Sequence, residues 1–268
     1  MARGVQSMVR LAVKGTSWSH LLDYLSPALF DVMPARDLIK QGRELMANRS
    51  DTVRFAETRR QVGDELASHG IEVHLVEKLE STEHKELAHL DGDGAREIGQ
   101  RILAVYFGQI FLGDRAILDL RSGSFMLSEP RALHWHPSAL YIEWEPRFLD
   151  AIRDLYVGFY LEDEGRFQRA LEALDMKDSA DVLIDLLGRD DPRNERFESA
   201  AFHTHFHEMF VSSRDRGTTL HRNFLALGVY LLCLYDALEC LGGSFDVRAA
   251  VERASGATTV GRVASVES

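Results

Sequence analysis

Apolar side chains recur every three or four positions along most of this chain, which is the spacing that places them on one face of a helix. Ile71–Glu77 alternates apolar and polar residues instead, which predicts a strand. The fold class that we expect is therefore mainly α (α+β). The predicted helices are Ser19–Asp31, Ala35–Ala47, Asp51–Ser68, Ala95–Phe111, Pro146–Tyr160, Gly165–Met176, Ala180–Leu187, Glu195–Val211 and Thr219–Leu241, with a short one from Asp246.

The segment between Arg115 and Trp144 does not have the helical period. Short apolar pieces alternate there with turn residues, which predicts loops and a small hairpin. The two strands of this hairpin are expected at Phe125–Leu127 and Ala132–Trp135. Asp91–Gly94 predicts a turn before the central helix.

Charge and cysteine usage narrow the class of protein. The net charge is −11, which disfavours a non-specific grip on nucleic acid or on an anionic membrane surface. Cys233 and Cys240, seven residues apart, would lie about 10 Å apart on a helix, beyond the reach of a disulfide. The longest apolar run, Phe224–Tyr235, is shorter than the roughly 20 residues of a membrane span. We expect a cytoplasmic protein with no transmembrane segment and no nucleic-acid partner.

Three alternating histidines, His203, His205 and His207, are the first candidates for chemistry. Neutral imidazole binds Zn, Cu, Fe and Ni. On a helix His203 and His207 share a face, whereas His205 points nearly opposite, so the three do not form a complete site. Ordinary helix positions explain them, and a transition-metal site is the alternative.

A longer series of elements runs from Val73 to Trp144. A strand precedes a buried helix that ends in Gly108-Gln109-Ile110-Phe111, and a loop with Asp119 and the predicted hairpin follow. This order resembles the AarF/UbiB-type atypical kinases over about residues 71–250. In that family a helix ending in Gln-Ile-Phe leads into His-Ala-Asp-Pro-His-Pro-Gly-Asn, a hairpin and Asp-Phe-Gly.

The resemblance implies roles for three residues. Asp119 takes the position that orients the acceptor, Ser124 replaces the magnesium-binding Asn, and His136 replaces the magnesium-binding Asp. Phosphoryl transfer needs Mg²⁺, for which a hydroxyl and an imidazole are poor ligands. Such a loss lowers the rate by about three orders of magnitude or more. We therefore expect a pseudokinase in which Asp119 is vestigial and its replacement by Ala changes stability little.

The resemblance also suggests a division of the chain. Residues 1–70 would be a reduced N-terminal helical region, 71–255 a helical kinase-like large lobe with a short strand and a small hairpin, and 256–268 a frayed tail. The family's nucleotide loop and its Lys-x-Gly-Gln element are absent, and Arg10–Lys14 is only faintly similar to the strand with the phosphate-binding lysine.

Three functions follow, of which the first is our expectation. It is a non-catalytic scaffold or regulatory subunit without a cofactor, bound to a protein partner or to a second copy. The second is a helical metal-binding accessory protein, and the third is an active atypical kinase. The helices Ile102–Leu112 and Phe224–Tyr235, apolar on almost every side, are buried either in the core or partly against a partner.

Overall fold

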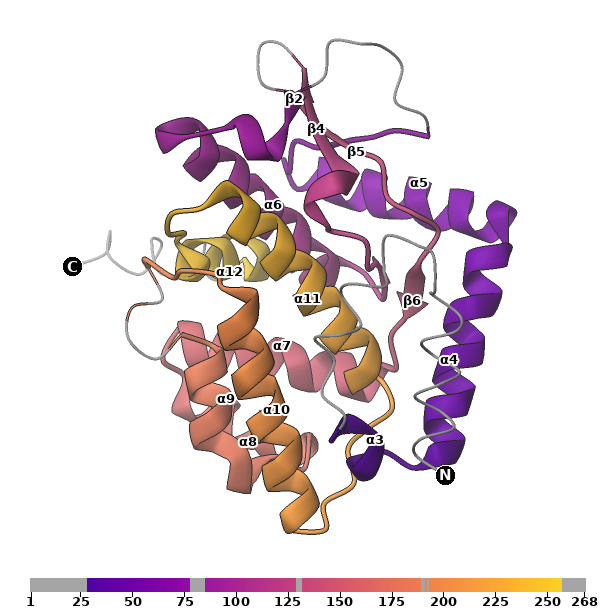
Figure 1. Ribbon diagram of the computed structural model, residues 1–268, viewed down its shortest axis with the longest axis vertical. Coiled ribbons are helices and arrows are strands. Elements are labelled where there is room, and N and C mark those ends of the chain that lie inside the picture. The colour runs from indigo at the N-terminus through magenta and orange to yellow at the C-terminus, as the bar shows by residue number, and fades with distance from the viewer. Residues whose placement is uncertain (1–27, 78–84, 129–131, 189–190, 192, 257–268) are drawn as a thin grey trace, which may run out of the picture.

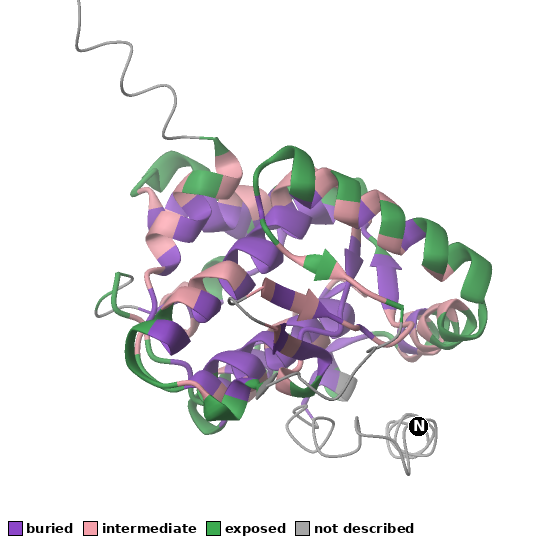
Figure 2. Cartoon of the chain, turned by 90° about the horizontal axis from the view of Figure 1, so that it is seen from above, coloured by how far each residue is buried: buried purple, intermediate pink, exposed green. Residues whose placement is uncertain are grey.

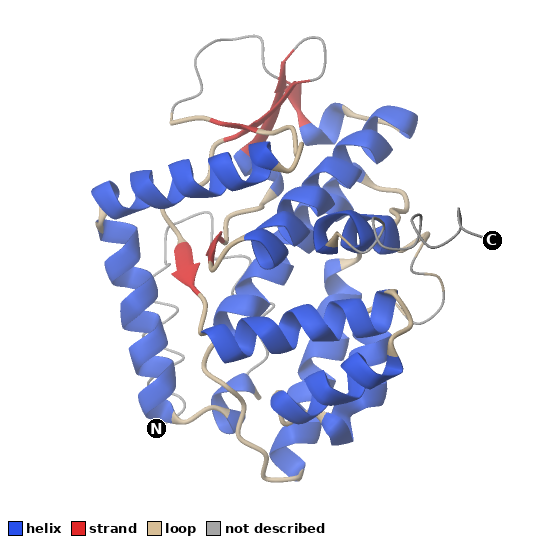
Figure 3. Cartoon of the chain, turned by 180° about the vertical axis from the view of Figure 1, so that it is seen from behind, coloured by secondary structure: helices blue, strands red, loops and turns tan. Residues whose placement is uncertain are grey.

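A computed structural model of the chain describes residues 28–77, 85–128, 132–188, 191 and 193–256. Within this part the fold is mainly α with a few short strands, as the sequence predicts (Figures 1 and 3). The α-helices are α3 (Leu29–Val32), α4 (Ala35–Ser50), α5 (Thr52–Ser68), α6 (Gly92–Leu112), α7 (Pro146–Tyr160), α8 (Glu164–Ala173), α9 (Ala180–Leu186), α10 (Ser199–Asp215), α11 (Phe224–Leu241) and α12 (Val247–Ser255). The strands are β1 (His74–Leu75), β2 (Lys85–Glu86), β3 (Arg115–Ile117), β4 (Phe125–Ser128), β5 (Ala132–Trp135) and β6 (Tyr141–Glu143).

Most of the predicted helices are confirmed, with differences at their ends. The expected turn at Asp91–Gly94 is wrong beyond its first residue, because α6 already begins at Gly92 with Asp91 as its N-cap. α10 and α11 each begin a few residues later than predicted. The helix expected over Ser19–Asp31 and the strand-like Arg10–Lys14 lie largely or wholly outside the described residues. So does the expected tail, apart from Gly256.

α6 and α11 form the centre of the molecule, where buried residues gather (Figure 2). Every residue from Ile102 to Ile110 of α6 is buried. By length and composition alone, α11 is the one helix among the described residues that could cross a membrane, and 78% of its apolar window is buried inside the protein. The core thus covers most of both helices, which favours core packing over a partner interface for them.

Gly108 lets α5 approach α6 closely. A Cβ at this position would lie 2.6 Å from Cδ2 of Leu66 and 2.7 Å from Cδ1 of Ile71, closer than side chains pack. The side chains of Val62 and Leu66 on α5 therefore join the same buried cluster as α6 and α11, and Leu38 of α4 belongs to this cluster as well. The division of the chain at residue 70 stays a prediction.

The strands form a small sheet and a separate ribbon. The sheet has the order β1-β5-β4-β2, in which β1 runs parallel to β5 and the other pairs are antiparallel. The predicted hairpin is confirmed as β4 and β5, with Phe125 opposite Trp135. The strand expected over Ile71–Glu77 shortens to β1. The ribbon, β3 paired with β6, was not predicted, because three-residue strands carry too little pattern to be recognised.

Candidate functional site

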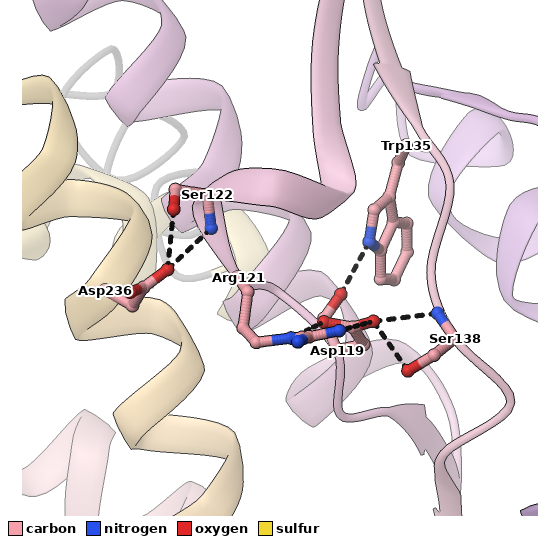
Figure 4. A network of polar contacts seen from close by, with 6 residues as sticks. All are labelled: Asp119, Arg121, Ser122, Trp135, Ser138 and Asp236. Carbon is pink, nitrogen blue, oxygen red and sulfur yellow. Dashed lines mark hydrogen bonds and ion pairs between the residues drawn. The ribbon is translucent and has the colours of Figure 1, made fainter. Parts of the chain in front are cut away.

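The loop that follows β3 is held at its start by the partner strand β6. In this antiparallel pair Ala116 lies opposite Ile142, so the chain leaves β3 beside the point where it enters β6. The N–H of Leu118 donates to the C=O of Leu140 at 2.9 Å. Residues 118–124 and 136–140 therefore meet at the base of the β4–β5 hairpin (Figure 4).

Asp119 lies at this junction and is completely buried, with 0% exposure. Its Oδ1 accepts a hydrogen bond from Nε of Arg121 at 2.7 Å, and its Oδ2 accepts one from Nη2 of the same guanidinium at 2.9 Å. Oδ2 also accepts from the backbone N–H of Ser138 at 2.8 Å and from its Oγ at 2.6 Å. Figure 4 shows the carboxylate between these two residues, so both of its oxygens are occupied by donors of the protein.

The charges of this pair stabilise each other. Burial alone would raise the pKa of the Asp119 carboxyl, because desolvation disfavours its charged form. The hydrogen bonds and positive charge of Arg121, together with the donors of Ser138, outweigh burial and hold this pKa below its ordinary value of 3.8. Desolvation opposes the charge on Arg121 as well, but its bonds to Asp119 raise the pKa of the guanidinium. The two side chains therefore form an ionised pair, in which the carboxylate is fully buried and the guanidinium is partly buried.

We expect part of the acid sensitivity of the fold to come from Asp119. Because its folded pKa lies below the ordinary value, its contribution to the free energy of unfolding is complete above about pH 4 and is lost as the pH falls through the folded pKa. Urea unfolding of the wild type and of Asp119→Asn from about pH 7 to about pH 2.5 measures this contribution. The difference between the two proteins should be constant near neutrality and shrink in acid. A difference that persists unchanged in acid would mean that the carboxyl is not ionised.

Two further contacts fix the same loop to the core. The N–H and Oγ of Ser122 both donate to Oδ2 of Asp236 on α11, each at 2.8 Å. The indole Nε1 of Trp135 on β5 donates to the C=O of Asp119 at 2.8 Å. The loop is thus connected to a central helix on one side and to the hairpin on the other (Figure 4).

Ser124 and His136, where the resemblance places the metal ligands, are neighbours at the base of the hairpin. The N–H of His136 donates to the C=O of Ser124 at 2.8 Å. The imidazole Nε2 of His136, however, lies 2.8 Å from the C=O of Glu77, and the Asp119 carboxylate contacts Arg121 and Ser138. The fold brings the three predicted residues into one region, but the imidazole and the carboxylate make separate contacts.

Gln109 joins this region to the core from α6. It is 2% exposed, its Oε1 accepts from the N–H of Ile117 at 2.7 Å, and its Nε2 donates to the hydroxyl of Tyr230 at 2.7 Å. A single side chain therefore connects β3 and α11. In the sequence it is a polar residue within an apolar helix, a signal that could have identified it.

Sequence reasoning did not identify the residues that bind the Asp119 carboxylate. Arg121 follows Asp119 by two positions, and a cation so close to a buried loop aspartate was the available signal. Ser138 is 19 positions away, and only the pairing of β3 with β6 brings it near. Asp236 of α11, which accepts from Ser122, was not identified either, although a lone acid on a largely apolar helix needs a donor.

The histidines of α10 lie as the helical spacing predicts. The rings of His203 and His207 are nearly parallel, with centroids 6.3 Å apart, so these two residues share a face. In the part of the chain that the structure describes, no three side chains among His, Cys, Asp and Glu are grouped so as to hold a metal ion. The transition-metal site stays an untested alternative.

Comparison with known proteins gives no family for this chain, since no protein-family model and no curated protein matches it. Its function has to be inferred from the arrangement of its own residues.

Proposed function

We propose that this protein is a non-catalytic, kinase-like scaffold or regulatory subunit of a protein complex. The observation that carries the proposal is the engagement of the Asp119 carboxylate by Arg121 and Ser138. A carboxylate that accepts four hydrogen bonds in a fully buried site has no free oxygen with which to orient an acceptor hydroxyl. The Asp119 carboxylate therefore stabilises the loop by binding Arg121 and Ser138.

The order of elements supports the kinase-like part of the proposal. The strand β1, the buried helix α6, a loop, the β4–β5 hairpin, a second loop and α7 follow one another as the parts of a kinase large lobe do. The β3–β6 ribbon brings the two loops together. In an active kinase these loops hold the acceptor-orienting Asp and the Asp and Asn that bind Mg²⁺.

The chemistry of the loops supports the non-catalytic part. Mg²⁺ prefers oxygen ligands, above all carboxylates, in octahedral geometry. Ser124 and His136 offer a hydroxyl and an imidazole at the two metal positions, and the imidazole already bonds to the backbone of Glu77. Contacts to Asp236 and Trp135 hold the first loop in place. A scaffold needs such a fixed shape, whereas phosphoryl transfer needs ligands that are free to bind metal and substrate.

We expect no magnesium-dependent binding of ATP, because the two loops hold no carboxylate that is free for the metal. Isothermal titration calorimetry with ATP and Mg²⁺, repeated with EDTA, measures this. The matched variant is Ser124→Asn/His136→Asp, which restores both ligand types of the family without touching Asp119. A dissociation constant in the low micromolar range that requires Mg²⁺ in the wild type would overturn the proposal. Gain of such binding only in the variant would support the kinase-like origin of the loops.

The cytoplasmic location and the protein partner belong to the same proposal. The chain has a net charge of −11, and Cys233 and Cys240 are both free thiols, which a reducing compartment preserves. A scaffold acts through a surface, and the buried α6 and α11 offer little of one. The surface therefore has to lie on other elements.

A further inference from the structure

The outer face of α4 is basic, although the protein as a whole is acidic. Leu38 and Gln41 form the buried side of this helix. Arg36, Lys40 and Arg43, spaced four and three residues apart, lie on the opposite side and are exposed. None of these three cations has an ion pair among the described residues. Unpaired charges of one sign along one helix face form a stripe that attracts opposite charge.

The stripe continues around the corner between α4 and α5. Arg49 and Arg54 are exposed there, also without an ion pair in the described ranges. Residues 36–54 hold five cations and three acids, Asp37, Glu44 and Asp51. Glu44 pairs with Arg222 at 2.7 Å, and Asp51 caps α5 by accepting from the N–H of Arg54 at 2.9 Å. Positive charge therefore predominates along the stripe.

Exposed apolar side chains lie on the same corner. Met46 is 55% exposed and Val53 is 70% exposed, and they are the large hydrophobic side chains that the described residues leave exposed. Met and Arg are enriched in protein interfaces. Burial of exposed apolar side chains against a partner is favourable, because it removes apolar surface from water. We name the surface formed by Arg36, Lys40, Arg43, Met46, Arg49, Val53 and Arg54 the basic arm.

A complementary surface lies at the opposite side of the molecule. Figure 1 places α8 and α9 far from α4. Residues 172–185 comprise the end of α8, the connection to α9 and most of α9. Lys177 is the one cation among them, and it pairs with Glu172. The exposed acids of this acidic segment are Glu172, Asp175, Asp178, Asp181 and Asp185. Asp181 and Asp185 also have contacts within the chain, and Arg216 of α10 donates to the C=O of Asp178, so the negative charge of the segment is partly compensated.

We propose that the basic arm docks on the acidic segment of a second copy of this chain. The inference rests on the proposed scaffold function and deepens it by naming the surface and the partner. Because the two surfaces differ and lie on opposite sides, the contact is head-to-tail and builds rings or short filaments. Complementary charge speeds such encounters, and salt weakens them because the Debye length falls to about 10 Å at 0.1 M.

Sedimentation velocity of the purified full-length protein at low and high salt tests this directly. The wild type should exceed its monomer mass of 30.3 kDa at low salt and return to it at high salt. Arg36→Glu/Lys40→Glu/Arg43→Glu should weaken association at least about tenfold, because it reverses the field of the arm. The control Arg96→Glu/Arg147→Glu/Arg253→Glu changes the net charge equally at exposed residues off the arm and should still associate.

A mixture of two variants identifies the contact itself. Asp178→Lys/Asp181→Lys/Asp185→Lys should also be monomeric, and an equimolar mixture with the arm variant should reassociate through its two unchanged surfaces. Circular dichroism melting shows whether each variant is folded. A wild type that is monomeric at low salt would overturn the proposal, as would an arm variant that associates like the control. If the wild type is monomeric and binds anionic vesicles, and the arm variant does not bind them, the basic arm is a membrane-binding surface and the proposal is overturned. Calorimetry with ATP tests the kinase-like scaffold independently of these outcomes.

Discussion

Asp119→Ala should lower the free energy of unfolding by about 3–5 kcal/mol, the range observed when one partner of a buried ion pair is removed. The substitution leaves the guanidinium of Arg121 without its carboxylate and removes the acceptor of two Ser138 donors. Urea unfolding followed by circular dichroism near neutral pH measures the loss. The expectation from sequence is that this substitution changes stability little. The complete burial of Asp119 and its four hydrogen bonds argue against that expectation, and the unfolding measurement decides between the two.

Two controls separate the ion pair from other effects. Asp114→Ala removes an exposed aspartate a few residues earlier and should change stability by no more than about 0.5 kcal/mol. Asp119→Ala/Arg121→Ala should lose less than the sum of the two single variants, because the guanidinium that loses its carboxylate in Asp119→Ala is absent from the double variant. Additive losses, or a loss below about 1 kcal/mol for Asp119→Ala, would contradict a structural role and return Asp119 to the candidates for catalysis.

The helices could be predicted because their signal is long and local. A helix such as Pro146–Tyr160 repeats its apolar positions over several turns and starts with proline, a residue favoured in the first turn. The hairpin could be predicted because the turn residues between Phe125 and Trp135 separate two apolar pieces. Both kinds of element depend on contacts between residues close in sequence.

The contacts of Asp119 could not be predicted in this way. The resemblance pointed to the loop that contains Asp119 and implied that this residue orients an acceptor. Such a role depends on the direction of the carboxylate, which the sequence does not show. That direction is fixed by Ser138, which approaches only because β3 pairs with β6, and each of these strands has three residues. Only Arg121, two positions away, was visible as a partner in the sequence.

The net charge of −11 does not show where the individual charges lie, because it is a sum over the whole chain. The cations of α4 gather on its outer face, and Glu44 is held by Arg222 on a distant part of the chain. The charge of a surface depends on which of its acids form ion pairs with residues distant in sequence, and only the three-dimensional structure shows these pairs.

Gln109→Leu should lower the free energy of unfolding by about 1–3 kcal/mol, because it leaves the buried N–H of Ile117 without its acceptor, whereas the Tyr230 hydroxyl keeps its bond to the C=O of Tyr106. The N–H of Ile117 loses the acceptor Oε1, and the hydroxyl of Tyr230 loses the donor Nε2. Leu is close to Gln in size, so the added apolar contact offsets part of this loss. Urea unfolding measures the total, and Gln61→Leu is the matched control, because Gln61 bonds to Glu65 on its own, half-exposed helix turn.

Hydrogen exchange followed by NMR gives a readout at the residue itself. In Gln109→Leu the amide of Ile117 should exchange faster relative to other buried amides, since β3 keeps its pairing with β6 but loses its link to α6. Exchange at Leu118, whose N–H donates to Leu140, should accelerate less. Unchanged protection of the Ile117 amide together with a lower stability would contradict this explanation. The loss of stability would then come from packing around residue 109 and not from the hydrogen bonds of Gln109 to Ile117 and Tyr230.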